Sequence, residues 1–218
     1  MVFHIPLRNG YFELSAWKFS EPFFNVQHVF VFDLALAGQL SSFVHPLPPG
    51  ISVEIHLKPD ESDLHRILAL FEQAGLRPRP AEESLKRGEM LALATANEAV
   101  AAYTWTAFSC AWVGEARRSL SPRDDQAVQY NTFVIPSWRG KGLQYGITRP
   151  VLQHLAKLGY KQTIAWVNAR NVRSIRNQLS QGKRCVATIT SSPILGLVRL
   201  RRLSQEADFT IERFRQHS

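Results

Sequence analysis

The residues best suited to chemistry in this chain form one short segment, Arg139-Gly140-Lys141-Gly142, which lies between a strand-like run and a helix-like run. Glycine allows positive φ angles and has no Cβ to block an approaching ligand. The first turn of a helix presents unpaired N–H groups and partial positive charge. Arg139 and Lys141 add formal charge beside it. The segment therefore predicts a cradle for an anion, and phosphate groups fit such a cradle well.

Two common phosphate-binding motifs are excluded for this segment. The spacing Gly-x-x-x-x-Gly-Lys-Ser/Thr of the Walker loop is absent, and the third glycine of Gly-x-Gly-x-x-Gly is missing at position 145, which is Tyr145. The alternative interpretation is an ordinary glycine-rich turn between a strand and a helix, with no ligand.

The elements that must position this loop follow from the apolar spacing around it. A strand is predicted over 126–135 and a helix from Pro136 to about Leu158, with Pro150 expected to kink the helix or shift its hydrogen bonds. Elsewhere the alternation of apolar residues and the cap signals predict a mixed α/β chain. Further strands are expected at 28–34, 51–57, 89–95, 99–108, 110–115, 163–168, 183–189, 195–200 and near 209–211, and further helices at 60–75, 82–87 and 170–181.

Three other segments indicate how the chain is divided into domains and loops. Residues 1–27 are rich in aromatic side chains and are expected to be irregular, and 116–125 is expected to be a turn or a mobile segment. The proline-rich stretch 45–50 is a stiff connector. We therefore predict an N-terminal extension over 1–50, packed on a main domain over 51–218. The extension is interpreted as structural, with an acceptor pocket or a dimer contact as the alternative.

The glycine-rich segment resembles the signature of the GNAT superfamily of N-acyltransferases, Arg/Gln-x-x-Gly-x-Gly/Ala. Here it reads Arg139-Gly140-Lys141-Gly142-Leu143-Gln144, after the family's usual Val-x-Pro-x-aromatic lead-in at 134–138. A second family pattern is an Asn, a small residue three positions later and a Gly eleven positions later. It matches Asn171, Ser174 and Gly182. The resemblance covers about 51–200.

The resemblance implies a GNAT-like α/β (α+β) fold, with a mixed, mostly antiparallel central sheet flanked by helices. It also implies acetyl-CoA, or another acyl-CoA, as co-substrate. Backbone N–H groups of the loop would hold its pyrophosphate, the strand Phe133-Val134-Ile135 would pair with its pantetheine arm, and Asn171 would contact the pantetheine or phosphates. A strand N–H would polarise the thioester carbonyl. The residues implied for cofactor binding are Phe133, Val134, Ile135, Arg139, Gly140, Lys141, Gly142, Leu143, Gln144 and Asn171.

The implied reaction is direct attack of a primary amine of a small-molecule acceptor on the thioester in a ternary complex. Gln144 departs from the family's Gly or Ala, and Gln178 stands where many members have the Tyr that protonates the leaving thiolate. A base is expected, but the strand 126–135 has no carboxylate, so no catalytic residue is assigned. The polar groups considered are Tyr130, Asn131, His28, Glu54, His56, Glu98, Glu115, Asp124 and Asp125.

The uneven distribution of charge along the chain suggests a competing hypothesis. The chain has 218 residues and a net charge of +8, but residues 136–218 alone hold fifteen basic and three acidic residues. Such a one-sided basic region attracts polyanions, so a module for nucleic acid or an anionic surface is one alternative. Nucleic acid is disfavoured because the sequence shows no helix-turn-helix and no aromatic RNA platform. A non-catalytic acyl-CoA-binding protein is the other alternative, and a homodimer is left open.

Composition sets the remaining bounds. An apolar fraction of 45% supports a sizeable core. Cys110 and Cys185 are too few for a disulfide framework and no Cys/His spacing suggests a metal site, so none is predicted. The start shows no signal-peptide pattern and the longest uncharged run, 99–114, is too short to span a bilayer. A cytoplasmic location and no membrane span are therefore expected.

Overall fold

The computed structural model describes residues 2–7, 10–15, 26–36, 46–192, 194–204 and 208–212. The chain forms two compact units. Unit 2 comprises Leu34–Ala111 and Ser121–Ala165. Unit 1 comprises Met1–Asp33, Trp112–Leu120 and Trp166–Ser218. The glycine-rich loop lies in unit 2.

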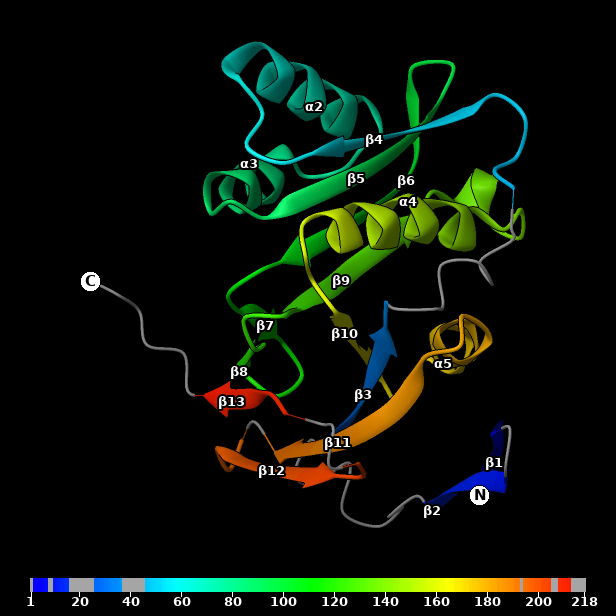
Figure 1. The fold of residues 1–218 in the computed structure, drawn as a ribbon, viewed down its shortest axis with the longest axis vertical. Coiled ribbons are helices and arrows are strands. Elements are labelled where there is room, and N and C mark those ends of the chain that lie inside the picture. The colour runs from blue at the N-terminus through cyan, green and yellow to red at the C-terminus, as the bar shows by residue number, and fades with distance from the viewer. Residues whose placement is uncertain are drawn as a thin grey trace. The chain divides into compact units, whose positions relative to one another are not determined.

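Unit 2 contains a sheet with the order β10-β9-β6-β5-β4 (Figure 1). Its antiparallel pairs join β4 to β5, β5 to β6 and β6 to β9, whereas β9 and β10 run parallel. The predicted mixed, mostly antiparallel sheet flanked by helices is confirmed. The strands are β4 (Ile51–His56), β5 (Met90–Ala96), β6 (Ala99–Ala107), β9 (Gln126–Val134) and β10 (Gln162–Asn168).

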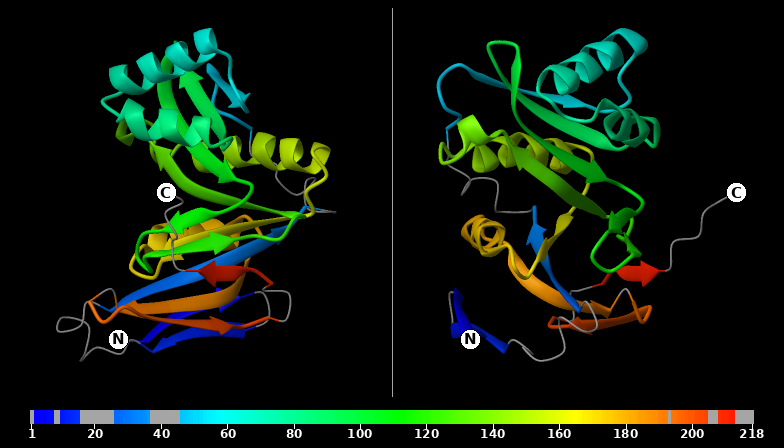
Figure 2. Two further views of the ribbon diagram at one scale, coloured as in Figure 1. Left: turned by 90° about the vertical axis from the view of Figure 1, so that its left-hand side faces the viewer. Right: turned by 180° about the vertical axis from the view of Figure 1, so that it is seen from behind.

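Helices cover both faces of this sheet because successive residues of a central strand such as β5 are apolar, so that each face carries apolar side chains. On β5, Met90, Ala92 and Ala94 belong to the apolar cluster of α4 (Leu143–Lys157). Leu91 and Leu93 face the cluster of α2 (Glu61–Gln73) and α3 (Pro78–Lys86). The edge view in Figure 2 shows α2 and α3 on one side of the strands and α4 on the other. The loop at the start of α4 is thereby fixed to a packed helix.

Unit 1 contains the strands β12-β11-β3 side by side, all antiparallel. Helix α5 (Val172–Ser180) contributes Ile175 and Leu179 to an apolar cluster with Phe30 and Phe32 of β3. A small sheet has the order β13-β8-β7. The strands of unit 1 not yet bounded are β1 (Val2–Leu7), β2 (Gly10–Ser15), β3 (Gln27–Ala35), β7 (Ala111–Val113), β8 (Arg118–Ser121), β11 (Arg184–Ser192), β12 (Leu197–Arg202) and β13 (Thr210–Glu212).

Three sequence predictions are wrong in detail. The N-terminal segment is not irregular throughout, because β1 and β2 pair as a hairpin. The segment 116–125 contains β8, whose Leu120 is fully buried between two serines, and the charged residues on either side of this short strand mask the pattern. Helix α3 begins at Pro78, earlier than the predicted 82, because a proline in the first helical turn forfeits no hydrogen bond. The division of the chain at residue 50 stays a prediction.

Candidate functional site

Strand β9 leads into the glycine-rich loop and carries a bulge. Tyr103 of β6 pairs with Phe133, and Trp105 pairs with Tyr130. Two residues of β9, Asn131 and Thr132, therefore oppose one residue of β6. Asn131 has φ 49°, and both bulge residues are exposed. A bulge of this kind breaks the regular ladder and turns backbone groups away from the neighbouring strand.

The two parallel strands stay paired over only part of their length. The register of β10 on β9 runs from Gln162–Gln126 to Ala165–Gln129, while β9 continues to Val134. The N–H of Ile135 donates to Ala101 on the β6 side. Since alternate residues of a strand direct their N–H and C=O groups to opposite edges, those of Val134 are directed to the edge away from β6. The end of β9 thus directs the N–H of Val134 to this edge, where the carbonyl of Val134 accepts from Arg139 Nε.

The loop itself turns sharply before helix α4. Residues Pro136–Trp138 form a 3₁₀ turn, and the expected continuous helix from Pro136 is therefore wrong. The helix begins at Leu143, because Gly140 has φ 80° and Gly142, its N-cap, has φ 75°. Neither angle is helical, and both favour glycine. Helix α4 then runs on through Pro150.

Unpaired donors gather in this turn. Within the described part of the chain, the N–H groups of Gly140, Lys141, Gly142 and Leu143 donate to no backbone carbonyl. The positions that a Cβ would take on Gly140 and Gly142 have no atom within 4 Å. Helix α4 has no acidic residue in its first turn. The loop therefore fits an anion, by its free donors, its open space and the positive end of the helix.

Two cations stand beside these donors. The guanidinium of Arg139 lies 5.6 Å from the ring centre of Phe133, and its Nε donates to the carbonyl of Val134 at 3.2 Å. Lys141 Nζ lies 4.2 Å from the ring centre of Trp138. Cation–π contacts of this length hold the charges near the loop without neutralising them. Both side chains are exposed and add to the attraction for an anion.

The structure brings most of the predicted site residues into one segment of unit 2. Leu143 is buried in the core under α4, and Gln144 is half-buried, with its carbonyl accepting from Thr148 Oγ1 at 2.7 Å. Asn171 lies in unit 1, where its side chain accepts from the N–H of Ser174 at 3.1 Å and caps α5. Its contact with a ligand stays a prediction.

Sequence reasoning considered Tyr130 but missed the buried polar cluster that it forms next to the bulge. The hydroxyl of Tyr130 donates to Oε2 of Glu89, and Arg87 Nε donates to Oε1 of the same carboxylate at 2.9 Å. Ser84 Oγ lies 3.5 Å from the Tyr130 hydroxyl. Glu89 is 8% exposed. Burial, with the hydrogen bond to Glu89, raises the pKa of Tyr130 well above its ordinary value.

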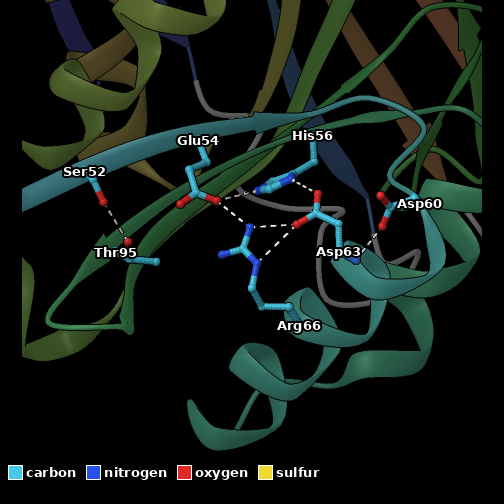
Figure 3. A network of polar contacts seen from close by, with 7 residues as sticks. All are labelled: Ser52, Glu54, His56, Asp60, Asp63, Arg66 and Thr95. Carbon is cyan, nitrogen blue, oxygen red and sulfur yellow. Dashed lines mark hydrogen bonds and ion pairs between the residues drawn. The ribbon is translucent and has the colours of Figure 1, made fainter.

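The other carboxylates and histidines considered have structural partners or lie in turns. His56 Nδ1 is 2.8 Å from Asp63 Oδ2, and Arg66 donates to Glu54 at 2.6 Å and to Asp63 at 2.7 Å (Figure 3). His56 Nε2 lies 3.3 Å from Glu54 without hydrogen-bond geometry. The network ties edge strand β4 to α2. The hydrogen bond from Arg66, above all, lowers the pKa of Asp63.

The remaining candidates are not brought to the bulge by any recorded contact. His28 Nδ1 lies 3.3 Å from Thr190 Oγ1 in unit 1, and Asp125 pairs with Arg123 at 3.1 Å. Glu98 lies in the turn between β5 and β6, with φ 62°. Gln178, at the position of the family's tyrosine, is buried in α5, and its Oε1 has no partner among the described residues.

No group of three or more His, Cys, Asp or Glu side chains among the described residues could hold a metal ion. None of the helices seen in the described ranges is long and apolar enough to cross a membrane.

Several solved structures share this fold. A GCN5-related N-acetyltransferase from Sphaerobacter thermophilus has a TM-score of 0.51 and 13% identity, over 81% of this chain and 52% of its own. A tandem GNAT protein from the clavulanic acid biosynthesis pathway has a TM-score of 0.50 and 16% identity, over 84% and 59%. A functionally unknown conserved protein from Staphylococcus epidermidis has a TM-score of 0.51 and 10% identity, over 88% of this chain and 71% of its own. No family model and no curated protein matches the chain.

These likenesses establish the fold. The chain has the GNAT fold, as its loop signature predicts, and the bulged strand and the glycine-rich helix start lie next to each other in unit 2. The chain spans between 52% and 71% of the length of the three structures.

Proposed function

We propose that this chain is an acyl-CoA-dependent N-acyltransferase that transfers an acetyl or other short acyl group to a primary amine of a small-molecule acceptor. One observation carries the proposal. Four N–H groups from Gly140 to Leu143, which donate to no backbone carbonyl of the described residues, stand at a helix start next to the end of a bulged strand. An elongated ligand with a diphosphate at one point and amide groups along its arm matches that combination.

Each part of the segment has a role in this proposal. The N–H groups of Gly140–Leu143 bind the diphosphate, with Arg139 and Lys141 as flanking charges. The N–H of Val134, directed away from β6, donates to a pantetheine carbonyl, since the carbonyl of Val134 already accepts from Arg139 Nε and Ile135 already donates to Ala101. Acyl-CoA supplies a thioester as the acyl donor. Backbone N–H groups at the bulge polarise its carbonyl, which favours the negative charge that develops on oxygen during attack.

The cluster at Glu89 supplies a route for the amine's proton. As the amine nitrogen bonds to the acyl carbon and the bond from carbon to sulfur breaks, the nitrogen must lose a proton. In our proposal, the Tyr130 oxygen accepts that proton while its own passes to the Glu89 carboxylate, along the hydrogen bond already present. The leaving thiolate takes a proton from water. Arg87 stabilises the ionised carboxylate before the transfer.

Binding and turnover together test this function. Acetyl-CoA is expected to raise the melting temperature and to bind in isothermal titration calorimetry, and thiol release is expected with at least one compound of a primary-amine panel. Absence of binding across acyl-CoA compounds of different chain length would overturn the proposal. Binding with no thiol release over the whole panel would contradict transfer and favour a non-catalytic acyl-CoA-binding protein.

A further inference from the structure

The hairpin of β11 and β12 in unit 1 exposes large apolar side chains at its turn. Ile194 is 68% exposed, Leu195 51% and Leu197 63%. The three lie within four positions of one another, where the chain reverses between Ser192 and Leu197. Isolated exposed leucines are ordinary, but a group of large apolar side chains exposed at one hairpin turn indicates a surface that a membrane or another molecule covers.

Positive charge follows the tip along the same strand. Leu197, Arg199 and Arg201 alternate along β12 and therefore share one face. Both arginines are exposed, and neither forms an ion pair with a residue that the structure describes. The stretch 183–204 contains five basic residues, no acidic residue and no aromatic residue. The turn of the hairpin is thus apolar, and strand β12, which follows the turn, is positively charged.

The turn is held in place by unit 1 itself. Arg118 of β8 donates to the carbonyl of Gly196 at 3.1 Å and to the carbonyl of Arg117 at 2.9 Å. Gly196 has φ 64°. Arg202 Nη2 donates to the carbonyl of Phe209 at 3.1 Å, which fixes the far end of β12. The apolar tip and the arginines Arg199 and Arg201 therefore keep a fixed spacing.

We propose that this hairpin docks on an anionic lipid bilayer, with Ile194, Leu195 and Leu197 entering the boundary of the acyl chains and Arg199 and Arg201 binding lipid phosphates. A strand rises by roughly 3.3 Å per residue, so Arg199 follows Leu197 by about 7 Å. Side chains of interfacial elements enter the boundary to a depth of about 5–10 Å. When Leu197 inserts, Arg199 stands at the depth of the headgroups.

The chemistry of the tip favours a bilayer over a nucleic acid. Single-stranded bases stack on aromatic side chains, and the stretch 183–204 has none. Aliphatic side chains gain little from contact with a phosphate backbone but gain from leaving water at an acyl boundary. A second copy of the chain would present the same positive charge to this face, which opposes self-association through it.

Vesicle co-sedimentation of the full chain tests the proposal. We expect binding to vesicles of phosphatidylserine and phosphatidylcholine at low salt, and little binding to phosphatidylcholine alone. Arg199→Ala/Arg201→Ala should weaken binding by roughly thirtyfold, since each basic residue near such a surface strengthens binding by roughly five- to sixfold. The matched control is Arg173→Ala/Arg176→Ala, which removes two exposed arginines from α5 in the same unit and should change binding far less.

The apolar part of the tip is tested separately. Leu195→Ser/Leu197→Ser should weaken vesicle binding at least tenfold and leave the melting temperature unchanged, because both side chains are exposed. Leu158→Ser, at a leucine 47% exposed that directly follows α4 in unit 2, is the control. The proposal is overturned if vesicles do not bind, if the double serine variant binds normally, if the chain binds a DNA duplex more tightly than the vesicles, or if the tip proves to be buried in a dimer that does not bind them.

Discussion

The hydroxyl of Tyr130 and the carboxylate of Glu89 meet in a hydrogen bond between residues 41 positions apart. Tyr130 lies on β9 immediately before the bulge, and Glu89 lies immediately before β5. Trp105 of β6 pairs with both Tyr130 and Leu91, so the sheet register sets their separation. A buried acceptor for protons thus stands at the strand whose free edge receives the acyl donor in our proposal.

We expect Tyr130→Phe and Glu89→Gln each to lower kcat by about 10²- to 10⁴-fold, the usual contribution of a positioned acid or base. The dissociation constant for acetyl-CoA should stay within twofold of the wild type, because neither side chain belongs to the loop. Steady-state kinetics with titration calorimetry measures both. A structural role alone would lower the melting temperature without this selective loss of kcat.

Matched variants separate the chemistry from the packing. Glu83→Gln removes a carboxylate of α3 that pairs with Arg79 at 3.1 Å on the surface. Tyr160→Phe removes the hydroxyl of another partly buried tyrosine, which packs on Phe108 at 5.2 Å between ring centres. Both should keep wild-type kcat. If kcat fell equally in the control variants and in the test variants, the proposed role of Tyr130 and Glu89 would be wrong.

The variant Gly142→Ala tests the role of the glycine-rich loop in binding acetyl-CoA. The φ of 75° makes an alanine there strained by about 1–2 kcal/mol. Gly50→Ala is a close match, because Gly50 has φ 77° and equally open space around its Cβ position. Both variants should lose similar stability in urea unfolding. Only Gly142→Ala should also weaken acetyl-CoA binding, by tenfold or more, and an equal effect at Gly50 would contradict the proposed loop.

The loop could be predicted from sequence because its signals are local. Glycines, flanking charges and a helix-like apolar spacing all fall within ten residues, and the structure places the free donors there. The helix start was misplaced because the positive φ angles of Gly140 and Gly142 delay it to Leu143. The contact of Glu89 with Tyr130 could not be predicted, since it depends on the pairing of three strands. The only local signal was an acidic residue directly before an uncharged strand.

The third prediction concerns pH and Lys183, which is 5% exposed. Burial lowers the pKa of its amine to about 7. Between that value and an unfolded pKa of about 10.4, the unfolded chain holds one more proton than the folded chain. The free energy of unfolding should therefore rise with pH in this window, by about 1.4 kcal/mol per unit at most. Below pH 7 the contribution is constant.

Urea unfolding at pH 7.0, 7.5, 8.0 and 8.5 measures this dependence. The range stops there because burial also raises the pKa of the Cys185 thiol to about 12, and that group lowers stability once an unfolded thiol ionises. Lys183→Met should be more stable than the wild type at pH 7 and should lose the rise. Lys161→Met, at an exposed lysine, should keep it. An unchanged slope in Lys183→Met would contradict the assignment.

The last prediction concerns the contact of Gly146 on α4 with Leu47. A Cβ at position 146 would lie 2.5 Å from Leu47 Cδ2 and 3.2 Å from its Cγ. Alanine in a helix interior is favoured over glycine by about 1 kcal/mol, so without this contact Gly146→Ala would stabilise the chain. We expect instead a loss of about 1–3 kcal/mol from overpacking. Leu47→Ala should relieve it, so that the double variant is more stable than the sum of the single losses allows. Urea unfolding of the four proteins measures this coupling, and a stabilising Gly146→Ala would show that Leu47 moves aside freely and does not fix the connector against α4.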